Sequence, residues 1–352
     1  MVAAARSGTG VIRAALDALD ALPRFSLLDG ASPIQRLHRL EAALGGRGPR
    51  LYAKRDDIGP VGVGGNKLRK LELLIGAAIA EGCDTFITVG ARQSNHARLS
   101  AAAAARAGLA CELVLTDSVD RTDDAYARNG NVLLDALFGA RVHRLPAGAD
   151  AVERAQARAD ELAQAGRRAY VVGSGGSSPL GCLGYARCAA EIVEQEKTFG
   201  ERFAQIIVPN GSSGTHAGLV AGLAALGDDP ARALSFTVLA PVEQAHAATV
   251  ALARAALGLI APAVPLMPGE VRVDPTQRGP GYGIPTDAMV EAVTMLARSE
   301  GLVADPVYSG KALAGMIARA RAAADADHAV LFVMTGGVPG LFAYEPVFRA
   351  SD

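Results

Sequence analysis

Lysine is scarce in this sequence, and most of it is clustered. Only five of the 35 basic residues are lysines, and the other 30 are arginines. Lys54, Lys67 and Lys70 lie within 17 positions, whereas Lys197 and Lys311 stand apart. Arginine supplies the surface cations here, and only a lysine amine readily forms a Schiff base with a carbonyl compound. A lysine in this chain is therefore a candidate for amine chemistry, above all in the segment 54–70.

The segment Gly64-Gly-Asn-Lys-Leu-Arg-Lys70 opens a predicted helix. Its two glycines allow the backbone to approach a ligand closely, and Asn66 can cap the helix. Lys67 falls in the first helical turn, where backbone amides lack intrahelical partners and attract anions. The segment can therefore hold an anion beside an amine. The alternative interpretation, from this segment alone, is a solvated basic helix start.

A second segment, residues 90–96, runs from a predicted strand through a polar turn into a helix, which is where α/β proteins place ligand-binding groups. Four polar side chains follow one another there: Arg92, Gln93, Ser94 and Asn95. Helix capping could account for Ser94 or Asn95, but it does not account for all four. This turn is a second candidate for ligand contacts.

A third segment, residues 208–218, combines glycines and hydroxyl side chains at another strand-to-helix turn. Backbone N–H groups and the helix dipole at such a turn form a cradle for a phosphate. The segment lacks the Gly-Lys-Ser/Thr end of a Walker A loop and does not match GxGxxG, which disfavours a nucleotide. We interpret His216 as a helix-start residue and not as a metal ligand.

Three C-terminal segments, residues 279–283, 305–309 and 335–337, are rich in Gly or Pro and could each be an ordinary turn. Tyr282 and Tyr308, however, are two of only seven tyrosines in the chain. A tyrosine flanked by Gly or Pro can place its phenol in a pocket. Both are therefore candidates for hydrogen bonding or acid–base chemistry.

A lysine amine, a phosphate cradle and a Ser-Asn pair together suggest pyridoxal 5'-phosphate (PLP), which combines an aldehyde with a phosphate. The chain contains, in order, the motifs GGNKLRKLE, QSNHAR, GSSGTHAGL, GPGYG, DPVYSGKA and TGGVPGLFAY. This ordered set resembles the 1-aminocyclopropane-1-carboxylate deaminase / D-cysteine desulfhydrase family of fold type II, tryptophan-synthase-β-like PLP enzymes. The resemblance runs from about residue 32 to the C-terminus.

The resemblance implies how the cofactor would be held. It makes Lys67 the Schiff-base lysine, and also the base that removes the substrate's Cα proton. It places Asn95 at the 3'-oxygen of the cofactor, and either Ser309 or Thr335 at the pyridine nitrogen. The phosphate would be bound by Lys70 and by the loop residues Gly211, Ser212, Ser213, Gly214 and Thr215.

The resemblance also implies catalytic side chains besides the lysine. Ser94 matches an active-site serine near the substrate carboxylate and the reacting atoms, and Tyr282 and Tyr308 match a pair of pocket tyrosines. These three would orient the carboxylate or assist the leaving group, and the division of roles among them stays open. No metal ion is implied.

Three departures from the family pattern point to one branch. Ring-opening deaminases of the family carry a glutamate where this chain has Ser309, a glutamine where it has His96, and a tryptophan, which it lacks entirely. A carboxylate keeps the pyridine ring protonated, whereas a hydroxyl is compatible with a neutral ring, which suffices for β-elimination. The departures favour the desulfhydrase branch.

The implied reaction is a PLP-dependent α,β-elimination from D-cysteine, or a similar small β-substituted amino acid, to pyruvate, ammonia and sulfide. In the same fold, the alternatives are a cysteate sulfo-lyase, dehydrochlorination of chloroalanine and 1-aminocyclopropane-1-carboxylate deamination. From another class, the alternative is a non-catalytic α/β protein that binds a small ligand or a nucleotide. The chirality of the substrate follows from the family name alone.

Short apolar runs alternate with alanine-rich helical stretches, which is typical of an α/β fold with mostly parallel sheets flanked by helices. Strands are predicted at residues 85–89, 111–115, 141–145, 169–172, 205–208, 235–239 and 329–334. Helices are predicted at residues 11–22, 67–81, 96–107, 126–138, 150–165, 182–198, 216–225, 286–299 and 310–324. The first of these would pack on the body or on a partner subunit.

The length of 352 residues exceeds the usual limit of roughly 250 to 300 residues for a single core, which favours two lobes. The resemblance implies a large PLP-binding domain of residues 1–69 and 176–352 and a small domain of residues 70–175, with the cofactor between them. The glycine-rich segment 173–178 is the best candidate for a crossing between the lobes. Family members form homodimers or larger homo-oligomers, so the same is expected here.

The composition excludes several other classes. The net charge of -1 and the absence of tryptophan argue against nucleic-acid binding. No stretch of about 20 apolar residues could span a membrane, and the N-terminus does not resemble a signal peptide. The four scattered cysteines show no zinc-binding spacing. We therefore expect a cytoplasmic protein that acts on a small-molecule substrate, without nucleic-acid or membrane partners.

Overall fold

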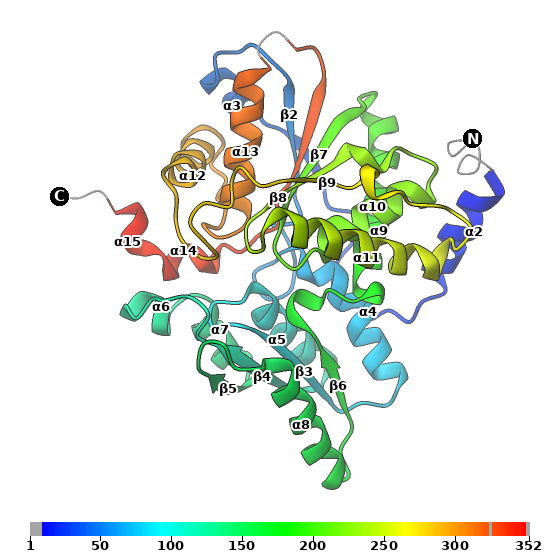
Figure 1. Ribbon diagram of the computed structural model, residues 1–352, viewed down its shortest axis with the longest axis vertical. Helices are drawn as coiled ribbons and strands as arrows, with labels where there is room; N and C mark the ends of the chain where they lie inside the picture. Colours follow the sequence, from blue (N-terminus) through cyan, green and yellow to red (C-terminus); the bar gives the residue numbers. More distant parts are fainter. Residues whose placement is uncertain (1–8, 324–325, 350–352) are drawn as a thin grey trace.

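The computed structural model describes residues 9–323 and 326–349, and its strands form two separate sheets (Figure 1). The larger sheet has the order β1 (Ile34–Arg36), β2 (Arg50–Lys54), β10 (Ala329–Val333), β7 (Phe203–Asn210), β8 (Ala233–Thr237) and β9 (Arg272–Asp274). The smaller has the order β5 (Arg141–Leu145), β4 (Ala110–Thr116), β3 (Thr85–Ala91) and β6 (Ala169–Val172). Neighbouring strands are parallel except for the antiparallel pair β1 and β2.

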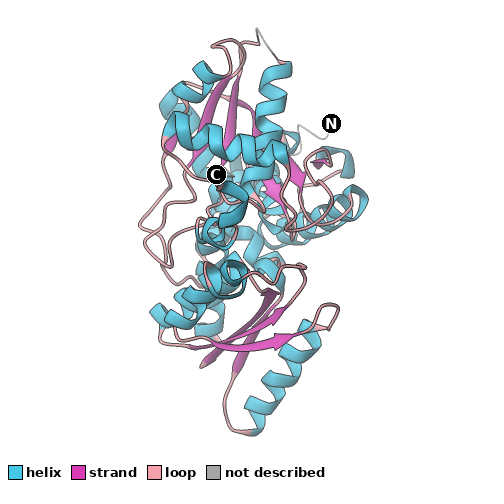
Figure 2. Ribbon diagram, turned by 90° about the vertical axis from the view of Figure 1, so that its left-hand side faces the viewer, coloured by secondary structure: helices cyan, strands magenta, loops and turns pink. Residues whose placement is uncertain are grey.

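Helices lie on both faces of each sheet (Figure 2). They are α2 (Thr9–Asp20), α3 (His38–Ala43), α4 (Lys67–Ala80), α5 (Asn95–Ala107), α6 (Asp124–Arg128), α7 (Asn131–Leu137), α8 (Ala151–Gln164), α9 (Pro179–Phe199), α10 (Gly214–Ala225), α11 (Val242–Ile260), α12 (Asp287–Glu300), α13 (Ser309–Ala322), α14 (Pro339–Ala343) and α15 (Glu345–Phe348). Three short 3-10 helices complete the set: η1 (Ser174–Gly176), η2 (Pro230–Arg232) and η3 (Pro268–Glu270).

The cores follow from strands that are buried on both faces. In β10, Leu331 and Val333 pack toward α9, α10 and α11, whereas Val330 and Phe332 pack toward α3, α12 and α13. All five residues of this central strand are buried, as expected for a parallel strand covered on both sides. In the smaller sheet, α4 and α5 cover one face and α8 covers the other. The α/β fold with helix-flanked parallel sheets is confirmed.

Most of the predicted elements are present, and their ends shift by a few residues. The predicted helix at residues 126–138 is wrong as a single element, because the structure divides it into α6 and α7. Gly130 lies between them with a φ of 64°, a conformation that glycine adopts without strain and that ends a helix. The strands β1, β2 and β9 and the long helix α11 were not predicted.

Each sheet has a point at which its chain connections diverge, and ligand sites of open α/β sheets lie at such points. In the smaller sheet this point lies between the adjacent strands β3 and β6, and in the larger sheet it lies between β7 and β10. The segment 173–178, which follows β6, leads the chain from the smaller sheet to α9. The predicted lobe boundaries near residues 70 and 175 stay a prediction.

The N-terminal helix α2 packs on the body of the protein. Ala15 and Leu19 are buried in the core beside α9, α10 and α11. The guanidinium of Arg187, on α9, donates to the main-chain oxygen of Leu19 and pairs with Asp20, so it binds the end of α2. Within the described part of the chain, no helix has the length and apolar character needed to cross a bilayer.

A buried histidine makes stability depend on pH. His216 is fully buried, its Nε2 lies 3.1 Å from the oxygen of Ala233, and its Nδ1 lies 2.9 Å from Oγ of Ser235. Burial lowers its pKa to about 4. The unfolded chain therefore binds a proton that the folded protein excludes, and stability falls as the pH drops from about 6.5, the usual value, toward 4.

We expect the free energy of unfolding of the His216→Gln variant to fall less steeply than that of the wild type over this range, by up to about 1.4 kcal/mol per pH unit. Urea unfolding at several pH values measures this slope. The exposed His38 provides the control, since the His38→Gln variant should keep the wild-type slope. Equal slopes for the His216→Gln variant and the wild type would contradict the assignment.

Candidate active site

A cavity of about 270 Å³ lies where loops from the two sheets meet. The turn after β3, the loop after β6, the loop after β7 and the end of β10 all contribute to its lining, together with the start of α4. Of the residues predicted from the sequence, the following line it: Lys67, Ser94, Asn95, Gly211, Ser212, Ser213, Thr215, Tyr282, Tyr308 and Thr335. Residues from six separate segments are thus brought together as predicted.

Lys67 presents a largely unpaired amine to this cavity. Its Nζ lies 3.3 Å from Oδ1 of Asn66, a long hydrogen bond. Burial, reinforced by the nearby charge of Lys70, lowers the pKa of Lys67 well below its usual value, although Asp305 opposes the shift. A lowered pKa increases the neutral fraction of the amine, and the neutral form is nucleophilic.

Asn66 does not cap the helix, contrary to its predicted role. Its own backbone is helical, and its side chain makes no cap hydrogen bond to α4. Instead, Nδ2 donates to Oγ1 of Thr215 at 2.9 Å, and the main-chain N–H donates to the oxygen of Thr335 at 3.1 Å. Asn66 therefore ties the start of α4 to the start of α10 and to the segment after β10, which positions Lys67 beside the loop 211–215.

The loop that precedes α10 forms the cradle. Ser213 has a φ of 64°, an uncommon left-handed conformation for a serine, and the amide of Gly214 donates to the oxygen of Ser212 at 2.8 Å. A Cβ on Gly211 would come within 2.8 Å of the Tyr308 ring, and a Cβ on Gly175 within 2.1 Å of Oγ of Ser212. The cavity end at this loop therefore requires glycine on both sides.

Lys70 lies behind the cradle and does not line the cavity. Its buried Nζ donates to the oxygen of Gly175 and to Oγ of Ser177, both at 3.1 Å. A Cβ on Gly214 would approach Nζ to 2.6 Å, so the amine sits directly against the loop. Burial lowers the pKa of Lys70 to about 8. Lys70, predicted to hold the phosphate together with Gly214, thus places its amine behind the loop that contains Gly214.

Ser94 is both a helix cap and a cavity residue. Its Oγ accepts a hydrogen bond from the amide of Ala97 at 3.1 Å, which leaves its own proton available to a group in the cavity. Gly90 makes room for it, because a Cβ there would lie 2.7 Å from that oxygen. Both interpretations of this residue from the sequence, cap and ligand group, are thus compatible.

His96 contributes a hydrogen-bond acceptor. The hydroxyl of Thr88 donates to the oxygen of Val172 at 2.9 Å, so it must accept from Nε2 of His96, which lies 2.8 Å away. This leaves Nδ1 without a proton, and among the described residues it has no hydrogen-bond partner. Burial lowers the pKa of His96 well below its usual value, with Lys67 and Lys70 adding to the shift.

Tyr282 and Tyr308 form a hydrogen-bonded pair, with 2.5 Å between their hydroxyl oxygens. Burial raises the pKa of both phenols, so both stay protonated near neutral pH. Lys311 supports the pair: its buried amine donates to the oxygens of Arg278 and Gly281 at 2.7 and 3.1 Å. It thereby holds the loop of Tyr282 against α13, which begins directly after Tyr308.

Ser309, one of the two alternative positions predicted beside the pyridine nitrogen, is not among the residues that line the cavity. Its hydroxyl donates to Oδ1 of Asp305 at 2.5 Å. The Asp305 carboxylate also accepts from the amides of Val307, Tyr308 and Ser309 and so binds the start of α13. Burial raises the pKa of Asp305. Thr335, the other predicted position, does line the cavity.

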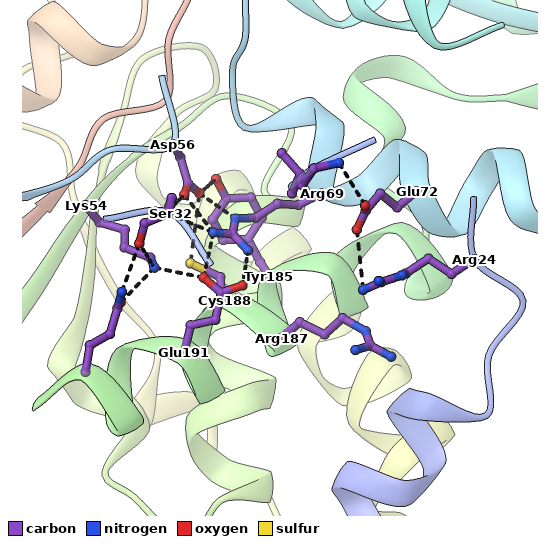
Figure 3. A network of polar contacts seen from close by, with 12 residues as sticks. Arg24, Ser32, Lys54, Asp56, Arg69, Glu72, Tyr185, Arg187, Cys188 and Glu191 are labelled. Carbon is purple, nitrogen blue, oxygen red and sulfur yellow. Dashed lines mark hydrogen bonds and ion pairs between the residues drawn. The ribbon is translucent and has the colours of Figure 1, made fainter. Parts of the chain in front are cut away.

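A buried network of charges, drawn in Figure 3, holds α4 through Arg69. Arg69 donates to both oxygens of Asp56 at 2.8 Å and to both oxygens of Glu191 at 2.7 and 2.8 Å. Tyr185 donates to Asp56 at 2.5 Å, and Lys54 donates to Glu191 at 2.8 Å. Burial alone would raise the pKa of Asp56, but Arg69 and Lys54 outweigh burial and lower it to about 2.

The sequence of the chain matches one family over most of its length. A family described as "Pyridoxal-phosphate dependent enzyme" matches residues 25–336. The chain belongs to this family.

Individual members agree with the match. A protein named D-cysteine desulfhydrase from Salmonella typhi is 42% identical over 330 residues, which cover 93% of this chain and 98% of that protein. A protein of the same name from Salmonella newport (strain SL254) is 41% identical over the same length and the same shares. The resemblance stated from the motifs is confirmed.

Solved structures give the same fold. An ACC deaminase homologue superposes with a TM-score of 0.84 at 34% identity and covers 95% of this chain and 98% of its own. O-ureido-L-serine synthase, at 20% identity and a TM-score of 0.62, covers 95% of this chain and 96% of its own. The second likeness concerns the fold alone. The fold type II architecture predicted for this pyridoxal-phosphate-dependent enzyme is confirmed.

The cavity fits the cofactor of the family on three counts. A loop at a helix N-terminus supplies backbone donors for a phosphate. Its glycines leave no room for a side chain, because a Cβ on Gly211 or Gly214 would clash with neighbouring atoms. A lysine amine whose pKa is lowered by burial faces the cavity, which favours the nucleophilic form that Schiff-base formation requires. Hydroxyl and amide groups line the space between them. Phosphate, aldehyde and ring substituents of PLP therefore each meet a suitable group.

Sequence reasoning missed residues whose role is to hold others. Asp305, Lys311 and Arg69 are all buried and each fixes a segment that carries a cavity residue. The sequence offers only weak signals for them: Asp305 precedes a proline, as in many turns, and Lys311 is one of five lysines. Arg69 and Lys311 contact segments that lie far apart in the chain, whereas Asp305 binds the start of α13 a few residues further on.

We expect the Arg69→Met variant to lose about 3 to 5 kcal/mol of unfolding free energy, because Asp56 and Glu191 would be left buried without their main partner. Chemical denaturation measures the loss. Arg13 serves as a matched control: it pairs with Asp17 at an exposed site, so the Arg13→Met variant should lose less than about 1 kcal/mol. Equal losses in the two variants would contradict a structural role for the network.

Proposed function

We propose that this chain catalyses α,β-elimination from D-cysteine, or a similar small β-substituted amino acid. Overall, D-cysteine and water would give pyruvate, ammonia and hydrogen sulfide. The observation that carries the proposal is the position of the buried Lys67 amine in one cavity with the hydrogen-bonded tyrosine pair, Tyr282 and Tyr308. The identity of 42% to a D-cysteine desulfhydrase supports the choice of substrate.

Bound PLP would withdraw electrons from the substrate's Cα, which is chemistry that no side chain here supplies. The phosphate would lie in the loop 211–215, with Lys70 beneath it as the compensating charge. Asn95 would donate to the 3'-oxygen. Thr335 is the better candidate for the pyridine nitrogen, because the hydroxyl of Ser309 is bound to Asp305.

The side chains of the cavity would divide the proton transfers. Nζ of Lys67 would bind the carbonyl carbon of the cofactor until the substrate amine takes its place, and the released Nζ would then accept the Cα proton. The tyrosine pair uses one hydroxyl proton in its own hydrogen bond, so the other is available to the departing sulfur or to the carboxylate. The free proton of Ser94 would bind the carboxylate.

The volume of about 270 Å³ suits a small substrate beside the cofactor. The absence of a carboxylate at position 309 favours β-elimination over ring-opening deamination, which relies on a strongly electron-withdrawing ring. A cysteate sulfo-lyase or a chloroalanine dehydrochlorinase would use the same groups with another leaving group. These alternatives are therefore distinguished by substrate and not by the cavity's acid–base groups.

We infer from the resemblance that the chain works as a homodimer or larger homo-oligomer in the cytoplasm. The four cysteines are free and buried, which fits a reducing compartment. We also propose the two-domain division of residues 1–69 with 176–352, and 70–175. The two separate sheets support it.

The deciding experiment is a substrate panel on the purified holoenzyme with PLP. D-cysteine should give pyruvate and sulfide in equal amounts, faster than L-cysteine, cysteate or chloroalanine. The formation of 2-oxobutyrate from 1-aminocyclopropane-1-carboxylate would instead revive the deaminase alternative. No keto acid from any of these substrates would refute the proposed elimination.

The Lys67→Ala variant should lose both the long-wavelength absorbance of the bound cofactor and all measurable turnover. Among the described residues, no second lysine lines the cavity to replace the lost amine. Absorbance and borohydride reduction of the PLP-treated protein measure the first effect. The Lys197→Ala variant is the matched control, since Lys197 is exposed and pairs only with Glu194 on its own helix. Turnover retained without Lys67 would refute its role.

A further inference from the structure

The orientation of the Asn95 side chain is decided by a residue of another helix. Nδ2 of Asn131, at the start of α7, lies 3.1 Å from the main-chain oxygen of Gln93 and 3.0 Å from Oδ1 of Asn95. A main-chain oxygen can only accept a hydrogen bond, so the atom of Asn131 that faces it is the nitrogen. The same nitrogen donates to Asn95, so the atom of Asn95 that faces Asn131 is the oxygen.

Asn131 is itself held in place by Gln93. The Nε2 of Gln93 donates to the main-chain oxygens of Tyr126 and Asn129, at 2.7 and 2.9 Å. This directs its Oε1 toward Asn131, whose main-chain N–H donates to it at 2.9 Å. Gln93 and Asn131 are both buried. The contacts depend on the break between α6 and α7, because the Asn129 oxygen would be engaged within a continuous helix.

The amide nitrogen of Asn95 consequently points away from Asn131. It lies close to Gly337, where a Cβ would approach it to 2.6 Å. Asn95 lines the cavity, and its oxygen is occupied by Asn131, so the group that it can offer to a ligand is an N–H donor. A donor suits the anionic 3'-oxygen of PLP, whereas an acceptor would be repelled by it.

We propose that Asn131 is a positioning residue for the cofactor: it keeps the Asn95 amide turned so that Nδ2 donates toward the 3'-oxygen. The proposal rests on the contact between Asn95 and that oxygen in the proposed function. Asn131 does not line the cavity, so its effect passes through Asn95. The proposed role also explains two of the polar residues in the turn 92–95, because Gln93 and Asn95 both form hydrogen bonds with Asn131 of α7.

The Asn131→Asp variant tests the proposal, because it preserves size and replaces the donor with an acceptor. The Asn95 amide would then lose its partner or turn its nitrogen toward position 131. Either way the donor to the 3'-oxygen is lost or weakened. We expect the pH midpoint of the absorbance change of the bound cofactor to shift by about one to two units, and the affinity for PLP to fall about tenfold.

The Asn131→Ala variant separates the lost donor from the added charge. It should shift the midpoint in the same direction but less, because it introduces no competing acceptor. Arg98 on α5 and Asp135 on α7 are charged groups buried between these helices, and no variant alters them. Circular dichroism of each holoenzyme checks that the fold is retained.

The matched control is the same substitution two residues earlier. Asn129 is exposed, and its Oδ1 accepts from the amide of Gly130 at 2.7 Å, a bond that an aspartate oxygen can also accept. The Asn129→Asp variant should therefore keep the wild-type midpoint and affinity. A shift equal to that of the Asn131→Asp variant would show a general charge effect and overturn the proposal.

The Asn95→Ala variant separates this proposal from the proposed function. If it shifts the midpoint, and the double variant with Asn131→Asp shifts it no further, then Asn131 acts through Asn95. If it shifts the midpoint while neither variant at position 131 does, the positioning role is wrong. If it causes no shift, the proposed contact of Asn95 with the cofactor is wrong, and the role of Asn131 falls with it.

Discussion

The buried charge pairing of Arg69 with Asp56 and Glu191 fixes helix α4, and the reactive amine depends on that helix. Arg69 and Glu72 lie on one side of α4, whereas Lys67 and Lys70 lie on another, since residues three apart share a helix face. The network contacts α4 through Arg69 (Figure 3), and Arg69 is not among the residues that line the cavity. Gly184 of α9 packs against the backbone of Arg69, where a Cβ would approach its oxygen to 2.2 Å. The ion pairs and the close helix packing together fix the position of α4.

Other buried lysines also hold segments of the chain in place. Lys54 belongs to the network, Lys70 donates to the oxygen of Gly175 in the loop after β6, and Lys311 holds the loop of Tyr282. Each of these three amines is buried and donates to oxygens within hydrogen-bond distance, including main-chain oxygens. A compact ammonium fits such narrow spaces better than a guanidinium. The amine of Lys67, by contrast, has only one long hydrogen bond, which leaves it free to react.

Residues 94–95, 211–215 and 335 line the cavity because each follows a strand, and strand ends of parallel sheets converge. The sequence allowed Asn66 to cap α4, but its side chain binds Thr215, 149 residues further along the chain. The hydroxyl of Ser309 binds Asp305. The prediction of a single helix at residues 126–138 was wrong because Gly130 interrupts the apolar helical pattern, and the structure has two helices there. The break there is stabilised by the side chain of Gln93.

The sequence by itself indicated the α/β class through its periodicity and the cofactor family through its motifs of contiguous residues, and many residues of those motifs line the cavity. Only the tertiary structure decided which groups are free to act. The lowered pKa of Lys67, the unpartnered Nδ1 of His96 among the described residues and the orientation of the Asn95 amide each result from burial and from partners supplied by other segments. Desolvation and hydrogen bonding act through space, so no spacing along the chain encodes them.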